Sequence, residues 1–345
     1  MVNKEKKRYY WADILKILAC FLVIINHTGG YLLQYSGYDN LGIIIFYIIN
    51  FAICKIAVPI FIMVSGFLLL QRENKYLDIV KRIFRILVPL LFLSMVVFFK
   101  KNGIGLYQLK DFIISFLKEP IIVPFWYLYM LIGLYLVTPF IQKMIKNFKM
   151  LDFQIFILIC LIIPSILPII TTYLHVSFNS NFLISILPIS VGYYVAGFYL
   201  SKIPLNKKYR NLALILFFVF LSIFACSMMV PYIYTSEISY QLDTWNYITT
   251  VIPALALFYL FRYYFTNKIF SIKVENIIFF ISSLTFGIYL FHTFVNYKIY
   301  DLEFMQSLFA FSPYIAIFVL EILTFICAGA ITFILKKIKF IRLFL

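Results

Sequence analysis

The sequence predicts an all-helical integral membrane bundle that crosses the bilayer about ten times, with both termini in the cytoplasm. Of its 345 residues, 64% are hydrophobic and only 13% are charged. Soluble globular domains are about 45–50% apolar and about 25% charged. At roughly 20 residues for each crossing, the chain has room for about ten spans. We therefore expect one membrane domain over residues 1–345, with the lipid bilayer as its surroundings.

Ten apolar runs divide the chain, and each predicts one helix. They cover residues 11–33, 43–70, 82–99, 125–142, 152–171, 182–200, 211–231, 245–262, 277–297 and 313–335. The first run is too long for a signal peptide and ends in Asn26-His27-Thr28-Gly29-Gly30 rather than in a small-residue cleavage site. We expect the mature protein to keep its N-terminus.

The charge distribution predicts the orientation. The chain has 30 Lys and Arg against 14 Asp and Glu, a net charge of +16. If the N-terminus is cytoplasmic, 23 of these cations fall in cytoplasmic segments and 5 in outer segments, and the other two, Lys16 and Lys55, lie within helices. This asymmetry is the usual signature of a multi-pass membrane protein. It predicts a multi-pass protein of the plasma or inner membrane and no nucleic-acid partner.

The five cysteines all lie in apolar runs, without the spacing of metal ligands. We therefore expect structural thiols and no metal site.

The first helix carries a polar stripe. It begins at Asp13 and continues at offsets of 3, 7 and 14 residues with Lys16, Cys20 and His27. This spacing places the four side chains on one face of the helix. Asp13 and His27 are about 21 Å apart along the helix axis at 1.5 Å per residue. Asp13 and Lys16 form either a tether at the helix end or part of a functional site. His27, at membrane depth, is a candidate general base.

The ninth helix carries a second polar stripe, which consists of Ser282, Thr285, Tyr289, His292 and Asn296. Polar side chains are costly against lipid, so we expect them to face the bundle interior. They serve either as interhelical hydrogen bonds or as part of a site.

Two further groups of cations are informative. Lys55 lies in the middle of the second helix and is expected to meet a cavity or an acidic partner. Arg82 and Arg85 share one helical face at the cytoplasmic boundary. They either enforce topology or grip a phosphorylated ligand through bidentate hydrogen bonds.

Five motifs follow one another along the chain. They are Arg8-x4-Asp13-x2-Lys16-x2-Ala19-x3-Val23-x3-His27, Val58-Pro59-Ile60-Phe61 with Ser65-Gly66-Phe67-Leu68, Arg82-x2-Arg85 with Pro89, Phe125-Trp126-Tyr127-Leu128 with Leu131 to Tyr135 and Thr138-Pro139, and Ser283 to His292. In this order they resemble the membrane acyltransferase-3 family, which modifies surface polysaccharides and other extracytoplasmic acceptors.

The resemblance implies an integral membrane O-acyltransferase without a permanently bound cofactor. It takes an acyl group, commonly acetyl, from cytoplasmic acyl-CoA to a hydroxyl of a carbohydrate or glycolipid acceptor outside. His27, with Asp13, would be catalytic, and Lys16, Arg82 and Arg85 would bind the donor. Five further residues are assigned either to positioning the acceptor or to hydrogen bonds that orient the reacting groups without touching the substrate: His292, Tyr289, Trp126, Lys55 and Ser65.

The chain departs from the family at two positions. Lys16 stands where the family usually has Arg, and Pro124-Phe125 replaces a histidine often found before the tryptophan of the fourth helix. The alternative functions are a transporter or flippase for a lipid-linked sugar, because polar intramembrane residues also mark substrate pathways, and an accessory membrane subunit.

Overall fold

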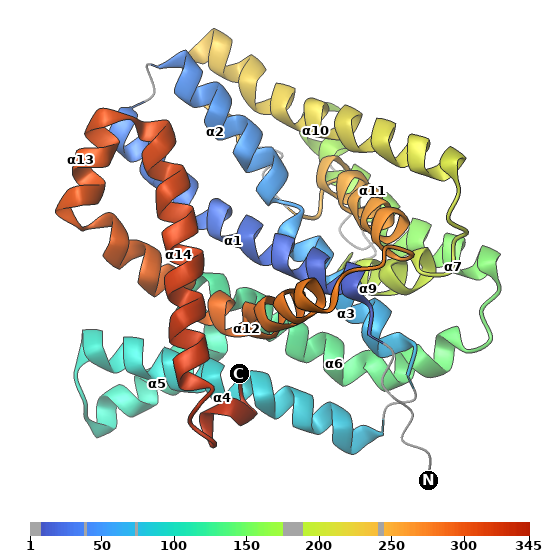
Figure 1. Cartoon of the computed structure of the whole chain (residues 1–345), viewed down its shortest axis with the longest axis horizontal. Coiled ribbons are helices and arrows are strands. Elements are labelled where there is room, and N and C mark those ends of the chain that lie inside the picture. The colour runs from blue at the N-terminus through green and yellow to red at the C-terminus, as the bar shows by residue number, and fades with distance from the viewer. Residues whose placement is uncertain (1–7, 38–39, 73–74, 175–188, 241–244) are drawn as a thin grey trace. The chain divides into compact units, whose positions relative to one another are not determined.

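The computed structural model describes residues 8–37, 40–72, 75–174, 189–240 and 245–345 (Figure 1). Helix makes up 84% of the structure, and the described residues contain no strand. This confirms the predicted all-helical class.

Nine helical segments in the described part of the chain are long and apolar enough to cross a membrane. They are formed by α1 (Tyr10–Ser36), α2 (Leu41–Cys54) with α3 (Ala57–Leu70), α4 (Tyr76–Asn102), α6 (Trp126–Ile145), α7 (Met150–Ile157) with α8 (Ile163–Leu174), α10 (Lys207–Thr235), α11 (Ile248–Phe265), α12 (Ile272–Tyr300) and α14 (Pro313–Leu335). The shorter helices are α5 (Leu106–Lys118), α9 (Ile189–Leu200) and α13 (Glu303–Phe311).

The structure refines the predicted elements in three ways. The second predicted helix is divided at Lys55 into α2 and α3, and a π-helical turn (Leu158–Ile162) joins α7 to α8. Helices α5 and α13 lie in segments that we expected to be loops. The sixth predicted helix is represented by α9, because its residues 182–188 lie outside the described residues.

Two compact groups of helices can be distinguished, and each is described by itself. The first unit contains residues 1–68 and 150–333, and the second contains residues 69–149 and 334–345. The prediction of one domain over residues 1–345 stays a prediction.

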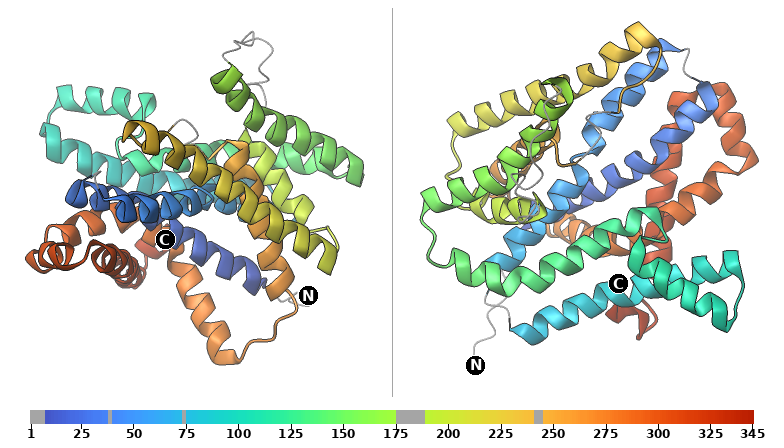
Figure 2. Two further views of the ribbon diagram at one scale, coloured as in Figure 1. Left: turned by 90° about the horizontal axis from the view of Figure 1, so that it is seen from above. Right: turned by 180° about the vertical axis from the view of Figure 1, so that it is seen from behind.

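In the first unit, α1 packs against α2, α11 and α12, while α10 packs against α11 and α2. The left view of Figure 2 shows α10, in yellow, crossing α11, in orange. Buried apolar side chains of α1, α2, α10, α12, α13 and α14 form one continuous apolar core in this unit. In the second unit, α4 packs against α5 and α6.

Two glycines let α3 and α9 approach closely within the first unit. A Cβ atom at Gly66 would overlap the carbonyl of Tyr194, and one at Gly197 would overlap the carbonyl of Met63. Small residues at crossings are typical of membrane helices, whose association depends on close van der Waals packing.

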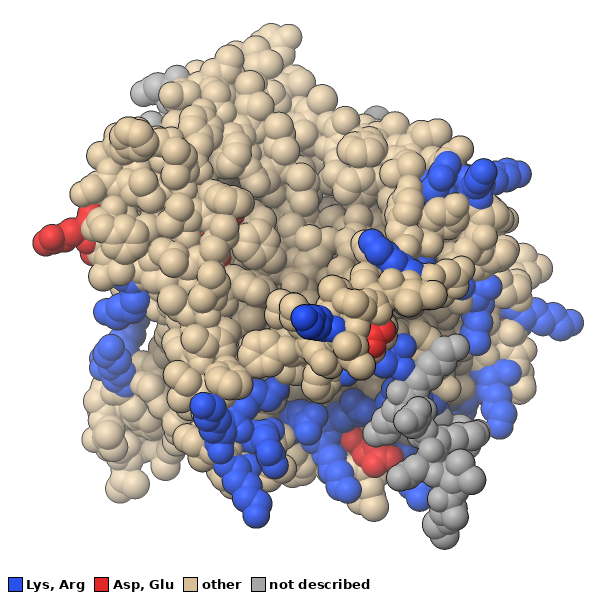
Figure 3. All heavy atoms as spheres, in the orientation of Figure 1, with Lys and Arg blue, Asp and Glu red and all other residues tan. Residues whose placement is uncertain are grey.

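The surface also fits a membrane protein. Large apolar side chains are exposed along α4, α10 and α14, for example Phe92, Phe218 and Phe318. The face shown in the space-filling view consists mostly of residues other than Lys, Arg, Asp and Glu (Figure 3). These exposed side chains are the ones that lipid would cover.

The direction of α12 bears on the number of crossings. Asp13 on α1 contacts Ser282, and His27 lies beside His292, so α1 and α12 run in the same direction. Six long spans separate these two helices, which would leave them antiparallel if nothing else crossed. The parallel arrangement therefore favours one further crossing, and α9 is the apolar helix available for it.

Candidate active site

The two predicted polar stripes face each other across the contact between α1 and α12. Ser282 Oγ, in the first half of α12, donates a hydrogen bond of 2.6 Å to Asp13 Oδ1 in the first turn of α1. Further along, Cys20 Sγ lies 3.5 Å from the carbonyl oxygen of Thr285. At the other end, the rings of His27 and His292 have centroids 5.2 Å apart, with their planes inclined at 45°.

The predicted cytoplasmic end is an ionic cluster around Asp13. The carboxylate, in a residue only 7% exposed, contacts Arg8 Nε at 2.8 Å and Lys16 Nζ at 3.0 Å. The ion pair between Asp13 and Lys16 is the contact expected if these residues tether the end of the first helix. Asp13 lies fourteen residues before His27 on the same helix, so it makes no direct contact with that imidazole. The catalytic role of Asp13 and the donor-binding role of Lys16 stay predictions.

The two histidines at the other end differ in burial and in bonding. His292 is fully buried, and its Nδ1 lies 2.6 Å from the carbonyl oxygen of Tyr289. A carbonyl only accepts hydrogen bonds, so Nδ1 carries the proton in neutral His292. Its Nε2 has no hydrogen-bond partner among the residues that the structure describes. His27 is half-buried.

Lys55 joins this region from the break between α2 and α3. Its Nζ lies 3.9 Å from the centroid of the Phe51 ring, which is a cation–π contact. Its ammonium group is also close enough to His27 for a Coulombic interaction. An aromatic face is thus one partner of Lys55, and the expected cavity or acidic partner stays a prediction.

The structure also places two other predicted residues of the first unit. Tyr289 is buried, and its ring centroid lies 5.8 Å from that of His292. Ser65 is half-buried on α3, next to Gly66 at the crossing with α9. Their proposed roles toward the acceptor stay predictions.

Sequence reasoning missed a buried carboxyl group beside this site. Glu321 on α14 is 7% exposed and accepts a hydrogen bond of 3.2 Å from Thr28 Oγ1, next to His27 in the chain. An acidic residue inside the apolar run 313–335 was the available signal, since the same criterion selected Asp13 and Lys55.

The arginines of the second unit lie on α4, as predicted. Arg82 is half-buried and Arg85 is exposed, with Arg85 Nε donating a hydrogen bond of 3.0 Å to the carbonyl of Leu343. Lys336 completes this cluster from the C-terminal segment. Burial lowers the pKa of Lys336, and the nearby Arg85 guanidinium adds to this effect. An anion bound here would favour the charged form of Lys336.

Trp126 opens α6 directly after a short 3₁₀ turn (Val123–Phe125). Its ring meets that of Tyr127 edge to face, with centroids 6.5 Å apart. The residue is half-buried, and its role toward the acceptor also stays a prediction.

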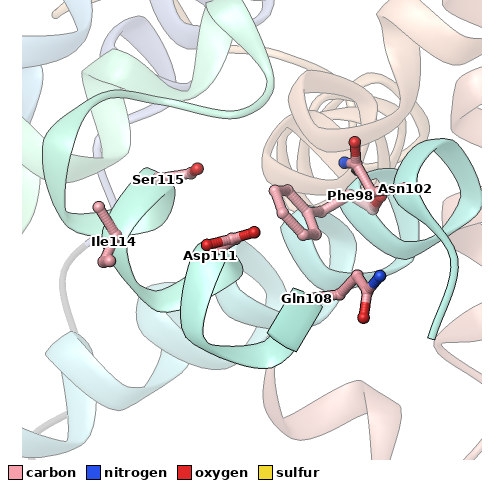
Figure 4. Close-up of a pocket in the computed structure, with 6 residues that line it drawn as sticks. All are labelled: Phe98, Asn102, Gln108, Asp111, Ile114 and Ser115. Carbon is pink, nitrogen blue, oxygen red and sulfur yellow. Dashed lines mark hydrogen bonds between the residues drawn. The ribbon is translucent and has the colours of Figure 1, made fainter. Parts of the chain in front are cut away.

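The second unit contains a groove of about 470 Å³ between the end of α4 and α5 (Figure 4). Its lining residues are Phe98, Asn102, Gln108, Asp111, Ile114 and Ser115. The Phe98 ring is held edge to face by its neighbours Phe99 and Phe112. The groove therefore combines one fixed aromatic ring with four hydrogen-bonding side chains.

Within the described ranges, no group of three or more His, Cys, Asp or Glu side chains could hold a metal ion. The five cysteines are free thiols, and three of them, Cys20, Cys54 and Cys160, are buried.

The fold and the site together define an integral membrane protein with a histidine-containing polar interior. A family model described as an acyltransferase domain matches residues 9–336. The chain belongs to the acyltransferase-3 family and is a membrane acyltransferase. No curated protein and no solved structure matches it.

Proposed function

We propose that this acyltransferase moves an acyl group, acetyl in the first instance, from cytoplasmic acyl-CoA to a hydroxyl of an extracytoplasmic carbohydrate or glycolipid. The observation that carries the proposal is the half-buried imidazole of His27 at the end of two packed polar stripes. The proposed location is the cell membrane of a bacterium. Membership of the acyltransferase family favours this function over the transport of a lipid-linked sugar.

In the proposed reaction, a neutral nitrogen of His27 accepts the proton of the acceptor hydroxyl. The hydroxyl oxygen then attacks the thioester carbonyl, the carbon–sulfur bond breaks, and the CoA thiolate takes the proton from His27. General base catalysis of this kind contributes typically 10²–10⁴-fold. In the alternative, a neutral nitrogen of His27 attacks the thioester carbonyl and the carbon–sulfur bond breaks, which gives an acyl-imidazole and the CoA thiolate. The acceptor hydroxyl then attacks the acyl carbon, the carbon–nitrogen bond to His27 breaks, and the hydroxyl proton goes to the thiolate.

The donor proposal is supported by the proximity of Arg85 and Lys336, with Arg82 three residues before Arg85 on α4. CoA carries phosphate groups, and arginine grips phosphate through paired hydrogen bonds.

The carbohydrate proposal is supported by the groove between α4 and α5. Sugars offer many hydroxyl groups, which both donate and accept hydrogen bonds, and apolar C–H faces. Asn102, Gln108, Asp111 and Ser115 supply matching donors and acceptors, and Phe98 supplies an apolar ring. The predicted topology places this groove at the outer side, where the acceptor would be.

The test uses the full-length protein in proteoliposomes with acetyl-CoA labelled in the acetyl group. We expect release of free CoA together with label on the glycans of a membrane extract. Mass spectrometry of surface glycans from cells with and without the gene identifies the acceptor. Absence of CoA release with every acyl-CoA offered would refute the donor assignment, and movement of a lipid-linked sugar without acyl transfer would support a flippase instead.

A further inference from the structure

We propose that His292 is a positioning residue whose Nε2 atom accepts a hydrogen bond from His27 and so fixes which nitrogen of His27 acts as the base. This inference rests on the proposed function only in naming His27 as the base.

The protonation pattern of His292 follows from its surroundings. The Tyr289 carbonyl, 2.6 Å away, can only accept a hydrogen bond, so the proton of neutral His292 is held at Nδ1. Nε2 is then a lone-pair acceptor in a residue with no exposed surface. No partner for this atom is found in the described part of the chain. A buried acceptor without a donor is costly, which indicates that a donor reaches it during function.

His27 is the donor that the geometry favours. The centroids of the two rings are 5.2 Å apart, and the planes are inclined rather than stacked. A small rotation of the half-buried His27 ring would bring one of its N–H groups toward Nε2 of His292. Hydrogen bonds at catalytic sites are often long before substrate binds and shorten afterwards.

An acceptor behind the base has two consequences. Nε2 of His292 keeps a proton on the His27 nitrogen that faces it. The other nitrogen of His27 then has the free lone pair that accepts the proton of the hydroxyl. Nε2 of His292 also stabilises the imidazolium that forms during transfer. A base oriented by a third group is the arrangement found in catalytic triads. Here a backbone carbonyl and a second histidine would take the place of the carboxylate.

Two substitutions separate this role from a structural one. Asn at position 292 places its amide nitrogen where Nδ1 stands, which keeps the bond to Tyr289 but removes the acceptor at Nε2. Gln is one carbon longer and places its amide oxygen near Nε2. For the proposed role, we expect His292→Asn to lower kcat about 10- to 100-fold, as for loss of one hydrogen bond that is strongest in the transition state, and His292→Gln to retain more activity. The apparent KM for acyl-CoA should stay the same in both.

If His292 only holds the hydrogen bond to Tyr289, the order is reversed: His292→Asn is active and His292→Gln is impaired. That result would overturn the proposal. A second control uses His27→Ala as the background. Because His292 acts through His27, His292→Asn should cause no further loss there, whereas an additional loss of similar size would show an independent role. An effect confined to the KM of the acceptor would assign His292 to the acceptor instead.

A spectroscopic measurement tests the pair without relying on turnover. Solid-state ¹⁵N NMR of histidine-labelled protein in lipid should show His292 protonated at Nδ1 and not at Nε2. The Nε2 resonance should move when His27 is replaced by Ala. An Nε2-protonated His292, or a resonance unchanged by His27→Ala, would refute the inference. If the wild type shows no acyl transfer but the expected His292 resonances are observed, the proposed function is refuted and the pairing of the two histidines is not.

Discussion

Ser282 on α12 donates a 2.6 Å hydrogen bond to Asp13 on α1, which joins two helices separated by most of the chain. The same carboxylate contacts Arg8 and Lys16. Two cations therefore share one carboxylate, which also connects the two stripes at their predicted cytoplasmic end.

Replacing Asp13 tests whether this cluster stabilises the fold. Asp13→Ala removes the acceptor of Ser282 and leaves Arg8 and Lys16 close together without their shared counter-charge. We expect a loss of about 1–3 kcal/mol in the free energy of unfolding. Ser282→Ala, which removes one neutral donor, should cost less. Thermal unfolding of the purified variants in detergent measures both. Unchanged stability of Asp13→Ala together with lost turnover would instead assign Asp13 a direct role in the reaction.

Replacing His27 tests the general base. We expect His27→Ala to lower acyl transfer by about 10²–10⁴-fold, since the hydroxyl would have no positioned proton acceptor. Insertion should be unaffected, because alanine removes a polar group from the membrane interior. The matched control is His175→Ala, which replaces the one histidine that we assign to neither stripe. His175 lies outside the described ranges. Near-normal turnover of His27→Ala at confirmed expression would contradict the assignment.

Replacing Arg82 and Arg85 by Lys separates ligand binding from topology. Lysine keeps the positive charge but not the forked hydrogen bonds of arginine. If the arginines bind CoA phosphate, loss of one charge-assisted bond of about 1.5–3 kcal/mol corresponds to roughly a 10- to 100-fold rise in the apparent KM for acyl-CoA. The KM of the acceptor should change much less. Isothermal titration with CoA checks the donor affinity directly.

Lys16→Arg is the complementary variant for donor binding. It restores the residue that the family usually carries, so donor affinity should be kept or improved. Equal affinity for CoA in the wild type and the double-Lys variant would return Arg82 and Arg85 to a role in orientation alone.

Single-cysteine labelling tests the predicted orientation. Both termini and the loops near Lys75, Lys146, Lys207 and Lys268 should react only from the cytoplasmic side, because the cations are concentrated there. The position near Lys207 decides whether α9 belongs to a crossing. Labelling of that loop from outside would refute the crossing that the parallel α1 and α12 favour. A residue of α5, such as Tyr107, is the control that should be labelled from outside.

The sequence alone determined the membrane class, nine of the ten spans and the polar face of each key helix. Apolar runs and a helical period of 3.6 residues are local properties, so they can be recognised without a partner. The same reasoning selected His27 and His292 separately, and the acyltransferase motifs placed the chain in its family before any contact was known.

The tertiary structure alone decided which polar groups meet. Periodicity shows that Asp13 and Ser282 face inward, but it does not show that α1 packs against α12 in the same direction. The contact between Lys55 and Phe51 depends on the break between α2 and α3. The approach of Lys336 to Arg85 depends on the position of the C-terminal segment beside α4. Such pairings depend on packing between segments that are distant in the chain, and a single sequence carries no local signal for that packing.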